Sequence, residues 1–274
     1  MTIPESIREL REKLQKNQLG HPILQRVLSI YITRAILPTR ITANQVTVAM
    51  LLVGVASAVP FFYGHIGWGL FLSYLCILLD ASDGEVARYR KSYSLRGIYL
   101  DLVNHLAIQS WFFLALGYAV AETQTGAMHD VVLIAAILGA LSFPLRRANG
   151  DLHREIYVHH YTAHPERFPL PAVGENRAEF AEGSPSGGFN PLALIKKAIY
   201  YSEYHAIMLV EIVAALVVEA IFFGGVEGHP VLSWLIIAYA AVSCLYLIKE
   251  IVAGYRDMDK RVASVKARLE SNEH

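Results

Sequence analysis

The sequence predicts an all-α integral membrane protein with six transmembrane helices, preceded by an N-terminal amphipathic helix at the membrane interface. Three observations support this fold class. The chain of 274 residues is 54% hydrophobic, long uncharged segments recur along it, and its basic residues gather in only some of the connections between them. Because 24 Lys and Arg balance 24 Asp and Glu, the near-zero net charge argues against a nucleic-acid partner.

The first forty residues carry two short amphipathic patterns. From Pro4 to Leu19, apolar residues alternate with charged ones at helical spacing, and Gly20-His21-Pro22 ends this helix. A second helix, from Ile23 to Leu37, has an apolar composition with two arginines that suits the membrane interface. We therefore expect residues 1–40 to form a juxtamembrane unit.

Six apolar segments approach the length of about 20 residues that a membrane-spanning helix needs. They are Val46–Tyr63, Ile66–Leu79, Ile98–Val120, Val131–Leu145, Ala206–Phe223 and Val231–Ile251. Together they predict a transmembrane domain over residues 41–255 that includes a long cytoplasmic loop, 146–204, and a polar tail, 256–274, that follows it. The centre of the loop, Pro165 to Pro191, is rich in Pro, Gly, Ser and Glu, which is typical of a mobile loop or lid.

The distribution of Lys and Arg predicts the orientation in the membrane. No Lys or Arg lies in the connections near His65, from Ala121 to Asp130, or from Gly224 to Pro230. All 24 lie in the remaining connections and near the two ends of the chain. By the positive-inside rule, we expect a multi-pass protein whose termini both face the cytoplasm.

Carboxylates and glycines recur at helical spacing beside the second and third apolar segments. Asp80 and Asp83 are three residues apart and share one helix face, while Gly97, Asp101 and His105 recur every four residues along the next helix. If these two helices pack antiparallel, the carboxylates converge on one pocket at the cytoplasmic side. Clustered carboxylate oxygens suit a hard divalent cation such as Mg²⁺.

This motif resembles the signature of a known enzyme family. The order Asp-x2-Asp-Gly-x2-Ala-Arg-x8-Gly-x3-Asp is similar to that of the CDP-alcohol phosphotransferases, integral membrane enzymes of phospholipid synthesis. Where the family carries a fourth aspartate, this chain has His105. The matching residues are Asp80, Asp83, Gly84, Ala87, Arg88, Gly97 and Asp101.

The resemblance implies a transferase that moves a substituted phosphate group from a CDP-alcohol to an acceptor hydroxyl and releases CMP. It implies that Asp80, Asp83, Asp101 and His105 hold one or two divalent ions, Mg²⁺ or Mn²⁺. Family members are commonly homodimers, so membrane lipids and a second copy of the chain are the implied partners.

The resemblance also implies where the substrates bind. The nucleotide and its diphosphate would contact Gly84, Ala87, Arg88, Gly97, Asn44 and Thr47. The last two belong to a segment similar to the Thr-Pro-Asn element that opens the first span in this family; alternatively, Thr42 in that segment only caps the helix. Arg146 and Arg147 are candidates for binding an anionic acceptor group, or serve only as positive-inside anchors.

His105 leaves three alternatives. An imidazole titrates near pH 6.5 in model compounds, about two units closer to neutrality than a carboxylate, so His105 is a candidate general base. It is also a candidate metal ligand that favours Mn²⁺, which tolerates nitrogen better. The third alternative is a catalytically impaired protein that only binds nucleotide or lipid.

The sequence allows alternatives for the donor, for the acceptor and for the class of protein. The size and span count look like those of enzymes that use CDP-diacylglycerol; a water-soluble CDP-alcohol with a lipid or glycan acceptor is the second choice. A transporter is a further alternative, because Asp101, Glu211 and Glu219 are acids within apolar segments. The lack of a detectable internal repeat argues against it.

Overall fold

The computed structural model describes residues 6–15, 23–92, 94–169, 205–223 and 228–271, and all the regular secondary structure in these ranges is helical. Five helical segments are long and apolar enough to cross a membrane, as in a multi-pass membrane protein. They are Ala43–Phe62 (α3 and α4), Ile66–Arg90 (α5), Leu95–Ala121 (α6), Ala127–Tyr161 (α7 and η1) and Pro230–Arg256 (α11). The sixth predicted span corresponds to α10 (His205–Phe222), and the count of six stays a prediction.

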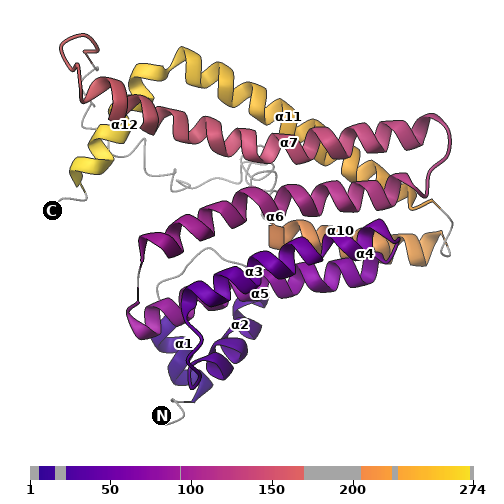
Figure 1. Cartoon of the computed structure of the whole chain (residues 1–274). Helices are drawn as coiled ribbons and strands as arrows, with labels where there is room; N and C mark the ends of the chain where they lie inside the picture. The colour runs from indigo at the N-terminus through magenta and orange to yellow at the C-terminus, as the bar shows by residue number, and fades with distance from the viewer. Residues whose placement is uncertain (1–5, 16–22, 93, 170–204, 224–227, 272–274) are drawn as a thin grey trace, which may run out of the picture.

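The long helices lie alongside one another, and α3 (Ala43–Ala56) packs against both α5 and α6 (Figure 1). Thr42 begins α3 with a capping box, because its hydroxyl accepts a hydrogen bond from the Gln45 amide while the Gln45 side chain accepts one from the Thr42 amide. The capping role considered for Thr42 is therefore confirmed. Met50, Cys76 and Ile108 form the buried contact among the three helices.

The remaining helices join a larger apolar core at the other end of α6. Phe61 of α4 (Ala58–Phe62), Phe112 and Phe113 of α6, and Ile236 of α11 are fully or almost fully buried there. A Cβ on Gly117 of α6 would lie 2.2 Å from the Ala136 Cβ on α7, so the glycine allows these two helices to approach closely.

Both predicted N-terminal helices are present, as α1 (Ile7–Gln15) and α2 (Ile23–Ile36). They pack on each other through buried Leu10, Leu14 and Ile30. The ends of the first predicted helix, before residue 6 and after residue 15, lie outside the described residues. A location in the membrane interface stays a prediction for both helices.

Helix α2 is attached to α5 by polar side chains rather than by apolar contact alone. The Gln25 side chain donates to the Ile77 carbonyl (3.0 Å), and the Ser29 and Thr33 hydroxyls each donate to one oxygen of Glu85 (2.9 and 2.6 Å). The Glu85 side chain is 1% exposed. A buried carboxylate is costly unless hydrogen-bonded, so these contacts fix α2 at one position along α5.

Helix α7 (Ala127–Ile156) extends well past the predicted end of its apolar segment at Leu145, and a π-helical turn, η1 (Tyr157–Tyr161), continues it. This segment is short for a span, and its helix is expected to continue into its polar end, as it does in the structure, where it occupies the first part of the predicted loop, 146–204. The last helix, α12 (Met258–Ser271), packs against α7 and η1, where Lys266 lies 3.2 Å from the Tyr161 hydroxyl. Most of the predicted mobile centre, Pro165–Pro191, lies outside the described residues.

Two acids inside α10 connect it to α11. One Glu219 oxygen accepts a hydrogen bond from the Leu232 amide in the first turn of α11 (2.8 Å), and the other lies 2.7 Å from His229 Nδ1. Glu211 accepts a hydrogen bond from Tyr239 of α11. Because Glu219 is 5% exposed and both its oxygens have partners, its position is explained by helix capping. This contact weakens the transporter alternative, which needed Glu219 on an ion path.

Candidate functional site

A pocket of about 340 Å³ opens where α5 ends and α6 begins, and α2 and α3 complete its wall. All the residues predicted to hold metal or nucleotide line this pocket. They are Asn44, Thr47, Asp80, Asp83, Gly84, Ala87, Arg88, Gly97, Asp101 and His105. The individual role of each of these residues stays a prediction.

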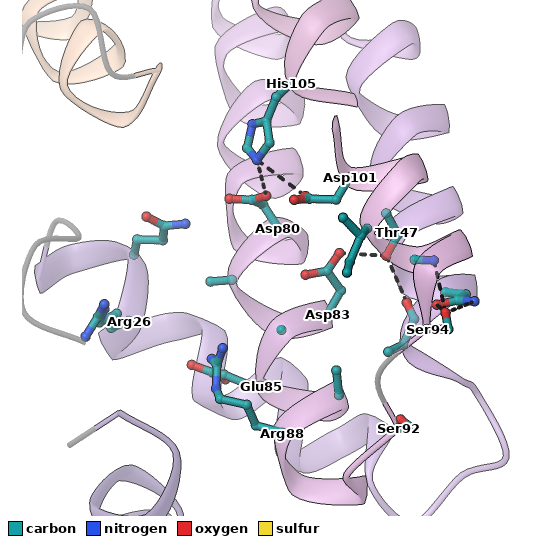
Figure 2. Close-up of a pocket in the computed structure, with 18 residues that line it drawn as sticks. Arg26, Thr47, Asp80, Asp83, Glu85, Arg88, Ser92, Ser94, Asp101 and His105 are labelled. Carbon is teal, nitrogen blue, oxygen red and sulfur yellow. Dashed lines mark hydrogen bonds and ion pairs between the residues drawn. The ribbon is translucent and has the colours of Figure 1, made fainter. Parts of the chain in front are cut away.

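Asp80, Asp101 and His105 form the tightest group in the pocket (Figure 2). His105 Nε2 lies 3.3 Å from an oxygen of Asp101 and 3.6 Å from an oxygen of Asp80. One donor atom from each residue falls within 4.8 Å of the others, so the three can hold a metal ion together. Two hard oxygens and one imidazole nitrogen fit Mg²⁺ or Mn²⁺, and the nitrogen favours Mn²⁺.

Asp83 has a different environment from the other predicted ligands. Its Oδ2 accepts a hydrogen bond from the Thr47 hydroxyl of α3 at 2.7 Å. Thr47 is itself held from α6, because the buried Asn104 side chain donates to the Thr47 carbonyl at 3.0 Å. The three helices are therefore joined at the pocket by one chain of contacts, and Asp83 lies outside the three-residue cluster.

The two motif glycines allow close approach within the pocket wall. A Cβ on Gly84 would lie 3.1 Å from Nη1 of Arg88, so the guanidinium folds over that glycine. A Cβ on Gly97 would lie 2.7 Å from the Asn44 side-chain oxygen and 3.2 Å from the Ser94 hydroxyl. Ser94 caps α6 by accepting from the Gly97 amide, and it also hydrogen-bonds Asn44 of α3. Gly97 therefore leaves room for the Asn44 side chain of α3 beside the first turn of α6.

Replacing Gly97 with Ala is expected to displace the Asn44 side chain, which lines the pocket, and to lower the transferase activity that the motif implies by up to roughly 10²-fold, because the placement of bound substrate changes. The measurement is the initial rate of CMP release, together with the thermal unfolding midpoint in detergent. Gly67→Ala is the matched control, since a Cβ there would meet nothing within 4 Å. Equal rates for the two variants would contradict this account of Gly97.

Several pocket residues were not predicted from the sequence. They are Gln25, Arg26, Ala43, Ala81, Glu85, Ser92, Ser94 and Ile98. A signal for some of them was present in α2, where Gln25, Ser29 and Thr33 recur every four residues on a helix that is otherwise apolar except for two arginines. Such a polar stripe indicates contact with a polar partner rather than with lipid.

Arg146 and Arg147 of α7 do not line the pocket. The Arg146 guanidinium lies 4.3 Å from the ring centre of Tyr246 on α11, which is a cation–π contact between these helices. Arg147 is exposed and lies close enough to Asp101 and His105 to act on both electrostatically. A role for the two arginines in acceptor binding stays a prediction.

Comparison with known proteins points to the same family as the motif. Residues 40–163 match the family described as CDP-alcohol phosphatidyltransferase. A relative from Thermococcus kodakarensis, named bifunctional IPC transferase and DIPP synthase, is 29% identical over 162 residues, which cover 56% of this chain and 37% of that protein. This chain therefore matches little more than a third of the length of its relative. The resemblance inferred from the motif is confirmed: residues 40–163 form a domain of the CDP-alcohol phosphatidyltransferase family, whose members are transferases.

Proposed function

We propose that this chain is a membrane enzyme that transfers a substituted phosphate group from CDP-diacylglycerol to an acceptor hydroxyl and releases CMP, in phospholipid synthesis. The observation that carries the proposal is the convergence of Asp80, Asp101 and His105 in a pocket that also contains Arg88. An acidic, metal-competent group beside a guanidinium suits a diphosphate, which needs charge neutralisation on more than one side.

In this proposal, the residues that line the pocket have separate roles. Asp80, Asp101 and the oxygens of Asp83 would hold one or two divalent cations. When bound, such a cation would neutralise the diphosphate and stabilise charge on the leaving phosphate oxygen. Arg88 would hold a phosphoryl oxygen through its planar fork of N–H groups. Gly84, with no side chain, would leave room for both the guanidinium and the nucleotide.

His105 would take the proton of the acceptor hydroxyl. The neutral imidazole is an efficient base near neutral pH, and Asp101, 3.3 Å from Nε2, would stabilise the imidazolium that forms. The same nitrogen atom cannot both bind a metal and accept a proton. The base and ligand roles of Nε2 therefore exclude each other, and they predict different behaviour on substitution.

An exposed apolar stripe beside the pocket favours a lipid substrate. Leu95, Ile98, Leu102 and Leu106 are all exposed and follow one face of α6, next to the face that carries Asp101. Acyl chains lying against this stripe would place a lipid headgroup at the pocket. The stripe suits a lipid donor or a lipid acceptor, so a water-soluble CDP-alcohol with a lipid or glycan acceptor is the second candidate.

The test is CMP release by the purified chain in lipid nanodiscs. CDP-diacylglycerol and water-soluble CDP-alcohols are compared as donors, each with glycerol phosphate, inositol phosphate, serine or a lipid acceptor, and with Mg²⁺, Mn²⁺ or EDTA. We expect metal-dependent CMP release with CDP-diacylglycerol and none with EDTA. No release from any donor, with CDP still bound, would replace the proposal by a non-catalytic nucleotide-binding protein.

The orientation and the oligomeric state complete the proposal. The Lys and Arg distribution supports a cytoplasmic site and cytoplasmic termini. Consistent with this, α1, α2 and α12 lie at the end of the bundle that holds the pocket (Figure 1). Family resemblance supports a homodimer. Labelling of single cysteines in intact cells measures the orientation in the membrane. The mass of the protein in nanodiscs measures the oligomeric state.

A further inference from the structure

Arg26 brings a second guanidinium to the pocket from outside the family motif. It lies on α2, before residue 40, where the family match begins. Both Arg26 and Arg88 line the pocket, and Figure 2 shows them on the side of Glu85, away from His105. The pocket therefore has an acidic part and a basic part, and the basic part is built from two separate helices.

The basic part of the pocket brings two like charges together. Arg26 and Arg88 interact electrostatically with each other, and Glu85 is the acid that attracts Arg26. Burial, together with the charge of Arg88, lowers the pKa of Arg26. The two guanidinium groups repel each other in a partly enclosed place, where charge repulsion is stronger than in water. A bound anion would relieve this repulsion.

One hydrogen-bond donor in this part of the pocket is also without an acceptor among the described residues. The Nε of Arg88 is buried, and among the described residues it has no hydrogen-bond partner. Both oxygens of Glu85 already accept hydrogen bonds, one from the Ser29 hydroxyl and one from the Thr33 hydroxyl. A ligand that supplies acceptor oxygens would satisfy Arg88, whereas a cation would not.

The position of Arg26 is fixed by its neighbours on α2. Gln25, the preceding residue, is 5% exposed and bonded to the Ile77 carbonyl of α5, and Ser29 and Thr33 bind Glu85 one and two turns further on. A helix that served only as a membrane anchor would not need this buried polar contact with α5. The contact holds the Arg26 side chain at the pocket instead of leaving it free at the surface.

We propose that Arg26 and Arg88 together bind a phosphoryl group of the nucleotide donor, so that the N-terminal helix α2 is part of the substrate site. Guanidinium groups bind phosphate oxygens through paired, charge-assisted hydrogen bonds. The inference rests on the proposed function in one respect, which is that the donor carries a cytidine diphosphate group.

The test compares binding of CDP and cytidine to the full chain in detergent by titration calorimetry, with no acceptor present. For Arg26→Gln, we expect CDP affinity to fall roughly ten- to a hundredfold, because one charge-assisted contact is lost, while cytidine affinity stays unchanged. Arg26→Lys should recover only part of the CDP affinity, because a lysine cannot form the paired contact. Arg34→Gln is the matched control, because Arg34 lies on the same helix but does not line the pocket.

Three results would overturn the inference. Wild-type CDP affinity in Arg26→Gln would show that Arg26 does not bind the nucleotide. An equal loss of CDP and cytidine affinity would show that the substitution displaces α2. Unchanged CDP affinity with a raised KM for a phosphorylated acceptor would assign Arg26 to the acceptor. Because the readout is binding, a chain that releases no CMP from any donor could still pass this test, so failure of the proposed function is seen separately.

Discussion

Replacing Asp101 with Asn is expected to reduce CMP release by roughly 10²- to 10⁴-fold, because it removes a negative charge that belongs to the metal-competent cluster and that would stabilise the protonated form of His105. Asp80→Asn should have a comparable effect, since its carboxylate completes the same cluster. The rate is measured as a function of Mn²⁺ concentration, and Mn²⁺ binding is measured directly by electron paramagnetic resonance. We expect the number of tightly bound ions to fall together with the rate.

Asp130→Asn provides the control for these substitutions. Asp130 is an exposed acid in the first turn of α7 that pairs with His129, and it does not line the pocket. Its removal changes the total charge of the protein by the same amount without touching the cluster. A rate in Asp101→Asn equal to that of the control would contradict the assignment of the cluster.

Replacing His105 with Ala is expected to lower turnover by roughly 10²- to 10⁴-fold while CDP remains bound, because the acceptor hydroxyl loses its base. A base must be neutral to accept a proton. The wild-type rate should therefore rise with pH through the titration of the imidazole and level off above it. His105→Asp should move this rise to lower pH, since a carboxylate loses its proton at lower pH. The measurement is the pH profile of kcat for the three proteins.

The metal dependence of the His105 variants separates the base role from the ligand role. If Nε2 is the base, His105→Asp adds a carboxylate to the metal site and should lower the Mn²⁺ and Mg²⁺ concentrations needed for half-maximal rate. If Nε2 is a ligand, excess Mn²⁺ should restore much of the activity of His105→Ala. Full activity of His105→Ala without added metal would exclude both roles.

The positions of the motif residues could be predicted because helical periodicity determines which side chains share a face. Asp80 and Asp83 line one pocket, as their three-residue spacing required. Asp101 and His105 meet because they are one turn apart on α6. Given antiparallel packing of α5 and α6, the spacing also predicted that their acids would converge on one pocket.

Contacts between helices that are distant in sequence could not be predicted in the same way. Periodicity gives the face of a helix but not the neighbour against which that face packs. For this reason the sequence did not reveal that Thr47 would donate to Asp83, or that Arg146 would lie over Tyr246. Arg26 was missed because an interfacial pattern in α2 does not reveal that the polar stripe of this helix faces Glu85.

The contact between Glu219 and the start of α11 has a consequence for biosynthesis. An unpaired acid inside a membrane-spanning helix opposes insertion, by about 2.5 to 3.5 kcal/mol at the helix centre and by less near an end, where Glu219 lies in α10. In this protein the Leu232 amide and the His229 ring supply partners to both oxygens, and both come from the helix that follows in the chain. If α10 is the sixth span, as the sequence predicts, it would enter the bilayer most easily together with α11, as a hairpin that leaves the translocation machinery in one step.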